Sequence, residues 1–155
     1  MTFSEQNVNR DQSGKFGEKV GAAPEVGLAR PLKYHRDLGF PSNFTPIQKP
    51  FTLEYSGHAE RASTDDRYGT IPKIGTLDPA TADLIEVEIE NGKAVKYLYR
   101  TPVPGTHRGK ELDVCIAAVP GEHKKAPWTV KTVWFNERDD LHRTLDTSKY
   151  DKPQS

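Results

Sequence analysis

Apolar and polar side chains alternate most clearly just before the Asn91-Gly92 pair. Three branched apolar residues alternate there with three glutamates, from Ile85 to Glu90. Alternation with a period of two is the pattern of a half-buried β-strand, and Asn-Gly is a strong signal for a hairpin turn. The sequence therefore predicts a β-hairpin over residues 84–99.

Two registers of this hairpin compete. A two-residue loop pairs Val87 with Lys96, which mixes polar and apolar side chains on both faces of the hairpin. A three-residue loop that ends at Gly92 pairs Val87 with Val95 and sets Glu86 against Lys96 on the opposite face. We favour the second register because it separates apolar residues from an opposite-charge pair. Gly92 would then adopt the left-handed conformation.

Three further runs, residues 51–55, 112–119 and 128–135, predict strands. The last of them is apolar on both faces, which is typical of a central strand. Between the first run and the hairpin, Ser56 offers a hydroxyl that caps a helix start, and the composition of residues 57–66 is helical.

This order of elements predicts an α+β fold. We expect an N-terminal helix packed on a small antiparallel β-sheet of about four strands, in a compact domain over residues 51–150. Residues 1–30 are polar with no apolar period, which favours a flexible leader, either solvated or docking on a partner. Residues 31–50 contain four prolines and are interpreted as an extended connector, and residues 151–155 as a tail.

Composition and charge narrow the classes of function. The formal net charge is zero, whereas a non-specific nucleic-acid coat protein carries a marked positive excess, so any RNA contact needs a local patch. Cys115 is the only cysteine; it suits a reducing compartment and lies in an apolar run, which favours a core side chain over a nucleophile. No apolar stretch approaches the ~18 residues of a membrane span, so we expect a cytoplasmic protein without a membrane partner.

Two runs carry a resemblance to a known superfamily: YSGHAERASTDDRYG at residues 55–69 and VKTVWFNERDDLHRTLDTSKYDKP at residues 130–153. With the strand-like runs, they resemble the barnase/RelE-like (BECR) ribonuclease-toxin superfamily. The first is similar to the opening of its polymorphic toxin and phage-encoded members, and the second to small actinobacterial phage or prophage proteins. Residues 5–28 are similar to a leader on phage and mobile-element proteins from such hosts.

The resemblance implies a toxin-like endoribonuclease in the cytoplasm of a host bacterial cell. Its substrate would be mRNA, tRNA or ribosome-bound RNA, and an antitoxin or another host protein is a further possible partner. The alternative is a catalytically inactive phage or prophage protein that binds and inhibits a host protein or a nucleic-acid complex. Basic groups gathered beside His142 would favour the enzyme, and a flat apolar or acidic sheet face would favour the inhibitor.

Metal-independent RNA cleavage needs a base, an acid and cations that stabilise the phosphorane. Histidine suits the first two tasks, and the candidates are His58 on the expected helix and His142 among nearby aspartates. Lys131 is the one charge inside its apolar strand and completes the proposed catalytic set. The structural alternatives are a helix-start residue, a polar turn and a solvated sheet face respectively.

Four residues are candidates for binding RNA phosphate. Arg61 lies three positions after His58 on the same helix face, and an ion pair with Asp65 is its structural alternative. The other three phosphate-binding candidates are Arg67, Arg143 and Thr144. The five histidines show no short paired spacing and one cysteine cannot anchor zinc, so neither a metal site nor a cofactor is predicted.

Overall fold

The computed structural model describes residues 31–141 and 145–153, which belong to one compact unit that begins at Pro31. The strands and helices of these residues are, in chain order, β1 (Leu32–His35), the 3-10 helix η1 (Arg36–Leu38), β2 (Phe51–Tyr55), α1 (Gly57–Thr64), β3 (Thr76–Leu77), β4 (Asp83–Glu90), β5 (Lys93–His107), β6 (Lys110–Val119), β7 (Trp128–Glu137) and the 3-10 helix η2 (Thr147–Lys149).

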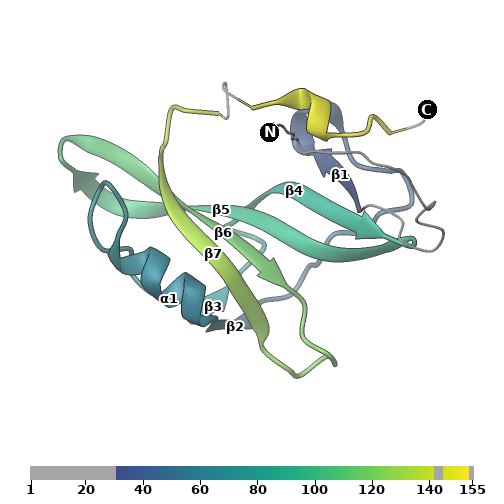
Figure 1. Ribbon diagram of the computed structural model, residues 1–155, viewed down its shortest axis with the longest axis horizontal. Helices are drawn as coiled ribbons and strands as arrows, with labels where there is room; N and C mark the ends of the chain where they lie inside the picture. Colours follow the sequence, from purple (N-terminus) through teal and green to yellow (C-terminus); the bar gives the residue numbers. More distant parts are fainter. Residues whose placement is uncertain (1–30, 142–144, 154–155) are drawn as a thin grey trace, which may run out of the picture. The chain divides into compact units, whose positions relative to one another are not determined.

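The strands form one seven-stranded sheet in the order β1-β4-β5-β6-β7-β2-β3 (Figure 1). Neighbours are antiparallel except for β2 and β7, which are parallel. The expected α+β fold, with a helix on about four antiparallel strands, is therefore wrong. The described residues form a mostly β structure with a mixed sheet and one short α-helix. β1 and β3 are short edge strands defined only by tertiary pairing, which local propensity cannot reveal.

The four central strands follow the predicted runs, but the favoured hairpin register is wrong. The β4–β5 turn is a two-residue loop, with Glu90 opposite Lys93. A β-bulge that leaves Val95 without a partner then shifts the register by one residue, so Val87 faces Tyr97. The bulge achieves the separation of apolar and charged faces that we had assigned to a longer loop. Gly92 is left-handed as expected, with φ 76°.

α1 begins where Ser56 caps it, as predicted. The Ser56 hydroxyl accepts a hydrogen bond from the Ala59 N–H at 3.1 Å. β2 pairs in parallel with the first part of β7, and α1 continues beside the rest of that strand (Figure 1). Ala59 and Ser63 are the buried residues of α1. The helix therefore flanks the part of β7 that no second strand covers.

The main core covers one face of the sheet. Tyr97 and Tyr99 of β5 lie there with Trp128 of β7, and Phe51 stacks on Trp128 with ring centroids 4.0 Å apart. Three side chains from the connector, Phe40, Phe44 and Ile47, pack against this core. β1 also comes from residues 31–50. The proline-rich segment thus contributes an edge strand and part of the core.

The opposite face carries a buried ionic cluster, which we call the Arg100 knot. The Arg100 Nε donates to Asp113 at 2.6 Å, and its terminal nitrogens donate to the backbone oxygens of Glu137, Arg138 and Asp140. Arg138 donates to the second oxygen of Asp113 at 3.0 Å. Arg100 is 4% exposed and Asp113 is 7% exposed. The Arg100 knot therefore joins β5, β6 and the turn after β7.

We predict that Arg100→Met destabilises the chain strongly. The substitution keeps apolar volume but leaves the Asp113 carboxylate buried with Arg138 as its remaining cation. Breaking a buried ion pair from one side typically costs about 3–5 kcal/mol, whereas an exposed pair contributes under about 1 kcal/mol. Urea unfolding should show this difference against the control Lys96→Met, which removes the more exposed ion pair with Glu88. Equal unfolding midpoints for the two variants would contradict the importance assigned to the knot.

Candidate functional site

The four predicted site residues that the structure describes do not gather at one place. His58 and Arg61 are exposed on α1, and the expected ion pair between Arg61 and Asp65 is not formed. Lys131 is exposed at a β-bulge of β7, where its carbonyl lies 3.5 Å from the Ser56 hydroxyl that caps α1. Among the expected catalytic residues, His58 and Lys131 thus both lie near the start of the helix. His142, Arg143 and Thr144 lie outside the described residues.

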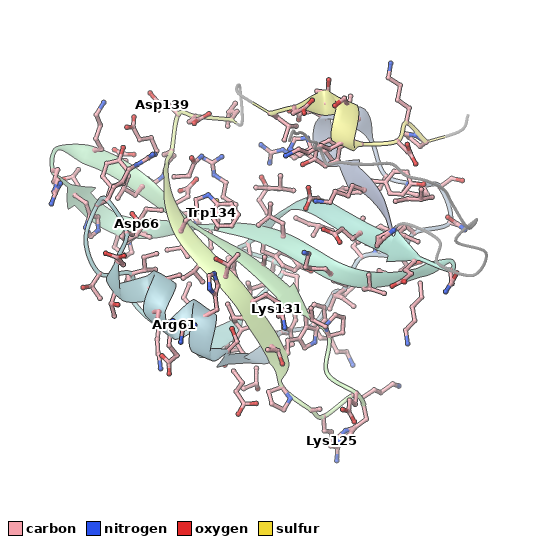
Figure 2. The ribbon with its side chains drawn as sticks, in the orientation of Figure 1. Arg61, Asp66, Lys125, Lys131, Trp134 and Asp139 are labelled. Carbon is pink, nitrogen blue, oxygen red and sulfur yellow. The ribbon has the colours of Figure 1, made fainter. Side chains whose placement is uncertain are left out.

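Arg67 lies at the other end of the helix. It follows the end of α1, and its guanidinium carbon is 4.9 Å from the centre of the Tyr68 ring. Figure 2 shows Lys131 on β7 and Asp139 just beyond the far end of that strand. Glu137 lies six positions after Lys131, which corresponds to about 20 Å of extended strand. The described ones among the sequence-predicted residues are therefore divided, with His58, Arg61 and Lys131 near the start of α1 and Arg67 after its end.

Asp66 fixes the loop that follows α1 against β7. One of its carboxylate oxygens accepts the Phe135 N–H at 3.1 Å, and the other accepts the Tyr68 N–H at 3.0 Å. The Phe135 N–H belongs to the edge of β7 that β2 does not reach. A single aspartate therefore provides the acceptor for a backbone N–H on this edge, and it also holds Tyr68 beside the end of the strand.

Glu137 is the centre of a polar group at this end of β7. The Tyr68 hydroxyl donates a short hydrogen bond to its carboxylate, and the Lys110 ammonium lies 3.5 Å away. The Tyr68 hydrogen bond, and then the charges of Lys110 and Arg67, lower the pKa of Glu137. This arrangement favours the ionised carboxylate, which can accept a proton from a bound molecule.

His107 comes to the same end of the sheet from β5. Its ring centroid is 5.3 Å from that of Phe135. Glu137 follows Phe135 by two residues on the same face of β7, a spacing of about 7 Å. His107 also faces Lys110 across the β5–β6 turn. We call the five residues Arg67, Tyr68, His107, Lys110 and Glu137 the Glu137 cluster.

A hollow of about 290 Å³ opens beside the Glu137 cluster. Its lining is formed by Gly109, Lys110, Glu111, Glu137, Arg138 and Asp139. This volume approaches the lower end of small-molecule binding sites. Two members of the Glu137 cluster, Lys110 and Glu137, therefore line a hollow that can admit a small polar group.

Few features of the sequence point to the Glu137 cluster. His107 and Lys110 lie in a run whose Pro and Gly content is typical of a loop, whereas the run forms the end of a long hairpin. Tyr68 and Glu137 are within or beside the runs that carried the family resemblance, but they received no role. The one signal in the sequence was Gly109 after Arg108, with polar residues on both sides. It is consistent with a hairpin turn that would pair His107 with Lys110.

Basic groups also gather next to Leu141, the last described residue before His142. A hollow of about 270 Å³ there is lined by side chains that include Arg36, Arg100 and Arg138. Each of these arginines is already engaged by at least one carboxylate. These basic groups lie beside Leu141 and mainly hold the structure together, whereas His142 itself lies outside the described residues.

Cys115 has the structural environment expected of a core residue. Its side chain is fully buried and packs with Ile85, Leu98 and Ala117. Burial raises the pKa of the Cys115 thiol to about 12. The thiol is therefore protonated at neutral pH and is a poor nucleophile.

Comparison with known protein families, curated proteins and solved structures finds no match to this chain. Within residues 31–141 and 145–153, three or more His, Cys, Asp or Glu side chains never come together in a way that would hold a metal ion. In the same residues, no helix is long and apolar enough to cross a membrane.

We predict that Tyr68→Phe raises the pKa of Glu137, because the variant lacks the hydrogen bond that contributes most to its lowering. Carbon-13 NMR titration of the glutamate side chains measures this pKa directly. Tyr150→Phe is the matched control, since it removes a similar hydroxyl from Glu86 and leaves Glu137 untouched. An unchanged titration of Glu137 in Tyr68→Phe would show that the hydrogen bond is absent in solution.

We also predict that the effect of Tyr68→Phe on the free energy of unfolding depends on pH. A carboxylate whose pKa is lower in the folded state than in the unfolded state stabilises the fold above its unfolded pKa. That contribution disappears as the pH falls through the folded pKa of Glu137. The difference in unfolding free energy between wild type and Tyr68→Phe should therefore be greatest near neutral pH and shrink in acid. A difference that grows toward acid pH would contradict this assignment.

Proposed function

We propose that this chain is an RNA-directed, ribonuclease-toxin-like domain that cleaves RNA without a metal ion, with the Glu137 cluster as its active site. One observation carries the proposal. A carboxylate, an imidazole, a phenol and two cations come from three separate parts of the chain to one end of the sheet. These are the groups that acid–base cleavage of a phosphodiester requires.

In the proposed reaction, the ionised Glu137 carboxylate takes the proton of the RNA 2′-hydroxyl. The 2′-oxygen attacks the adjacent phosphorus, and the bond from phosphorus to the 5′-oxygen breaks. Protonated His107 donates its proton to the leaving 5′-oxygen, since imidazole exchanges protons readily near neutral pH. The products are a 2′,3′-cyclic phosphate and a free 5′-hydroxyl, and no oxidant, reductant or further reactant is consumed.

The remaining residues of the cluster support this chemistry. Lys110 and Arg67 supply positive charge to the phosphorane, whose additional negative charge develops on its equatorial oxygens. Tyr68 keeps the Glu137 carboxylate ionised and in place. The net charge of the whole chain is zero. A phosphate nevertheless responds mainly to the charges nearest to it, because salt screens those farther away.

The proposed substrates are mRNA, tRNA or ribosome-bound RNA in the cytoplasm of a host bacterial cell, and an antitoxin or another host protein is a proposed partner. Kinship with the barnase/RelE-like superfamily is part of this proposal. The α+β fold that the kinship implied is not observed, because the described residues form a mostly β, seven-stranded mixed sheet. Fold analogy alone does not establish an activity, so the proposal depends on the chemistry of the site.

The site residues predicted from the sequence have other roles in this proposal. His58, Arg61 and Lys131 are exposed near α1 and the first half of β7, where they can contact the RNA backbone away from the scissile bond. His142, with Arg143 and Thr144, is the competing candidate for the general acid. Its substitution therefore belongs in the same experiment as that of His107.

We predict that Glu137→Gln and His107→Ala each lower the rate of RNA cleavage by about 10²–10⁴-fold, the usual contribution of an acid or base. The measurement is single-turnover cleavage of a labelled RNA in excess EDTA. Glu90→Gln and His123→Ala are matched controls at exposed positions outside the cluster, and they should cleave at the wild-type rate.

Thermal unfolding of each variant separates loss of chemistry from loss of structure. If His142→Ala abolishes cleavage while His107→Ala does not, the general acid is wrongly assigned. If wild type leaves RNA intact yet still inhibits bacterial growth, the enzyme proposal fails and the inhibitor of a host protein or nucleic-acid complex replaces it.

A further inference from the structure

Two hairpins of this sheet have the same turn with different residues. Asn91 and Gly92 join β4 to β5 with φ 53° and 76°, and Arg108 and Gly109 join β5 to β6 with φ 53° and 78°. Two-residue turns with both φ angles positive are type I′ turns, for which Asn-Gly is the preferred sequence. The second hairpin therefore has arginine where asparagine is the favourable residue.

Arg108 is one of two described residues other than glycine with a positive φ, and the other is Asn91. The left-handed region is costly for most side chains because Cβ approaches the following carbonyl oxygen, but asparagine tolerates it. Turn formation thus does not explain an arginine at this position. Strained residues of this kind cluster at functional sites, so the strain at Arg108 indicates a role other than forming the turn.

The hairpin places Arg108 directly beside the Glu137 cluster. Its neighbour His107 and the residue across the turn, Lys110, both belong to that cluster. The β5–β6 hairpin extends beyond β4, because the pairing of β5 with β4 stops at Arg100, opposite the first residue of β4, Asp83 (Figure 1). Arg108 is exposed there and forms no ion pair with any residue between 31 and 141 or between 145 and 153.

The outer edge of this projecting hairpin is not suited to binding another strand. Pro102 and Pro104 lie on the part of β5 beyond β4, and neither has a backbone N–H to donate. Prolines at an exposed edge block the addition of a further strand. Side-chain recognition at the turn is therefore the better-supported use of the projection.

We infer that Arg108 binds the RNA backbone at a phosphate next to the scissile one. The inference rests on the proposed function and adds a substrate contact to it. A guanidinium binds a phosphate through two parallel hydrogen bonds, and its charge assists both. Arg108 lies in the exposed turn between His107 and its cross-strand partner Lys110, so one RNA strand can contact all three.

The test is Arg108→Asn, which gives the second hairpin the turn sequence of the first. The variant should unfold at a higher temperature than wild type, because asparagine relieves the left-handed strain. It should also bind RNA at least several-fold more weakly, with a salt dependence reduced by about one phosphate contact. The probe is a short single-stranded RNA that carries 2′-O-methyl groups, which prevent cleavage during the binding measurement.

Two control variants isolate the position and the charge. Lys124→Asn removes an exposed cation from the β6–β7 loop and should leave RNA affinity nearly unchanged. Arg108→Lys keeps the charge and the strain but loses the paired hydrogen bonds, so its affinity should lie between those of wild type and Arg108→Asn.

The outcomes distinguish this inference from the proposed function. A stabilised Arg108→Asn variant that binds RNA with wild-type affinity and salt dependence overturns the inference, whether or not the chain cleaves RNA. A wild-type chain that binds the blocked RNA through Arg108 but cleaves no unblocked RNA supports the contact and overturns the enzyme proposal. A wild-type chain that binds no RNA overturns both.

Discussion

The guanidinium of Arg100 joins the middle of β5 to the neighbouring strand β6 and to the backbone that leaves β7. It bonds to Asp113 on the neighbouring strand and to three backbone oxygens at the end of β7 and just after it, those of Glu137, Arg138 and Asp140. Buried carbonyl oxygens and a buried carboxylate are costly unless they have donors. Arg100 provides several donors at once, so the chain can turn away from the sheet at a defined residue.

This constraint determines where the candidate site can form. The backbone oxygen of Glu137 is bound by Arg100, and the carboxylate of the same residue accepts the Tyr68 hydroxyl. Glu137 is therefore held through both its backbone and its side chain. Arg138, the next residue, bonds to Asp113 and to the backbone oxygen of Val103 in the projecting part of β5. The end of β7 and the β5–β6 hairpin are thus fixed to each other, which brings His107 near Glu137.

Local sequence patterns predicted the central strands and the capped helix because each depends on neighbouring residues. The alternation around Val87, the Ser56 cap and the apolar run of β7 all appear as expected. The register of the β4–β5 hairpin was not predictable in this way, since a bulge at Val95 and a two-residue turn together reproduce the facial pattern of a longer loop. The edge strands were also missed, because β1 is defined by its pairing with β4.

The candidate site was less predictable than the fold elements. Its residues are separated by up to about seventy positions, and only tertiary structure brings Tyr68 to Glu137. Sequence reasoning favoured histidines with polar neighbours, whereas His107 lies in a run whose Pro and Gly content is typical of a loop. The zero net charge gave no indication of local cations either, because it sums the charges of the whole chain and says nothing of where they lie.

The chemical nature of the RNA ends tests the central claim most directly. Wild-type chain is incubated with a defined RNA in excess EDTA, and the fragments are examined by mass spectrometry. The account predicts fragments that end in a 2′,3′-cyclic phosphate and begin with a 5′-hydroxyl, since the 2′-oxygen is the nucleophile and no metal-bound water takes part. Fragments with a 3′-hydroxyl and a 5′-phosphate, or RNA that stays intact, would contradict it.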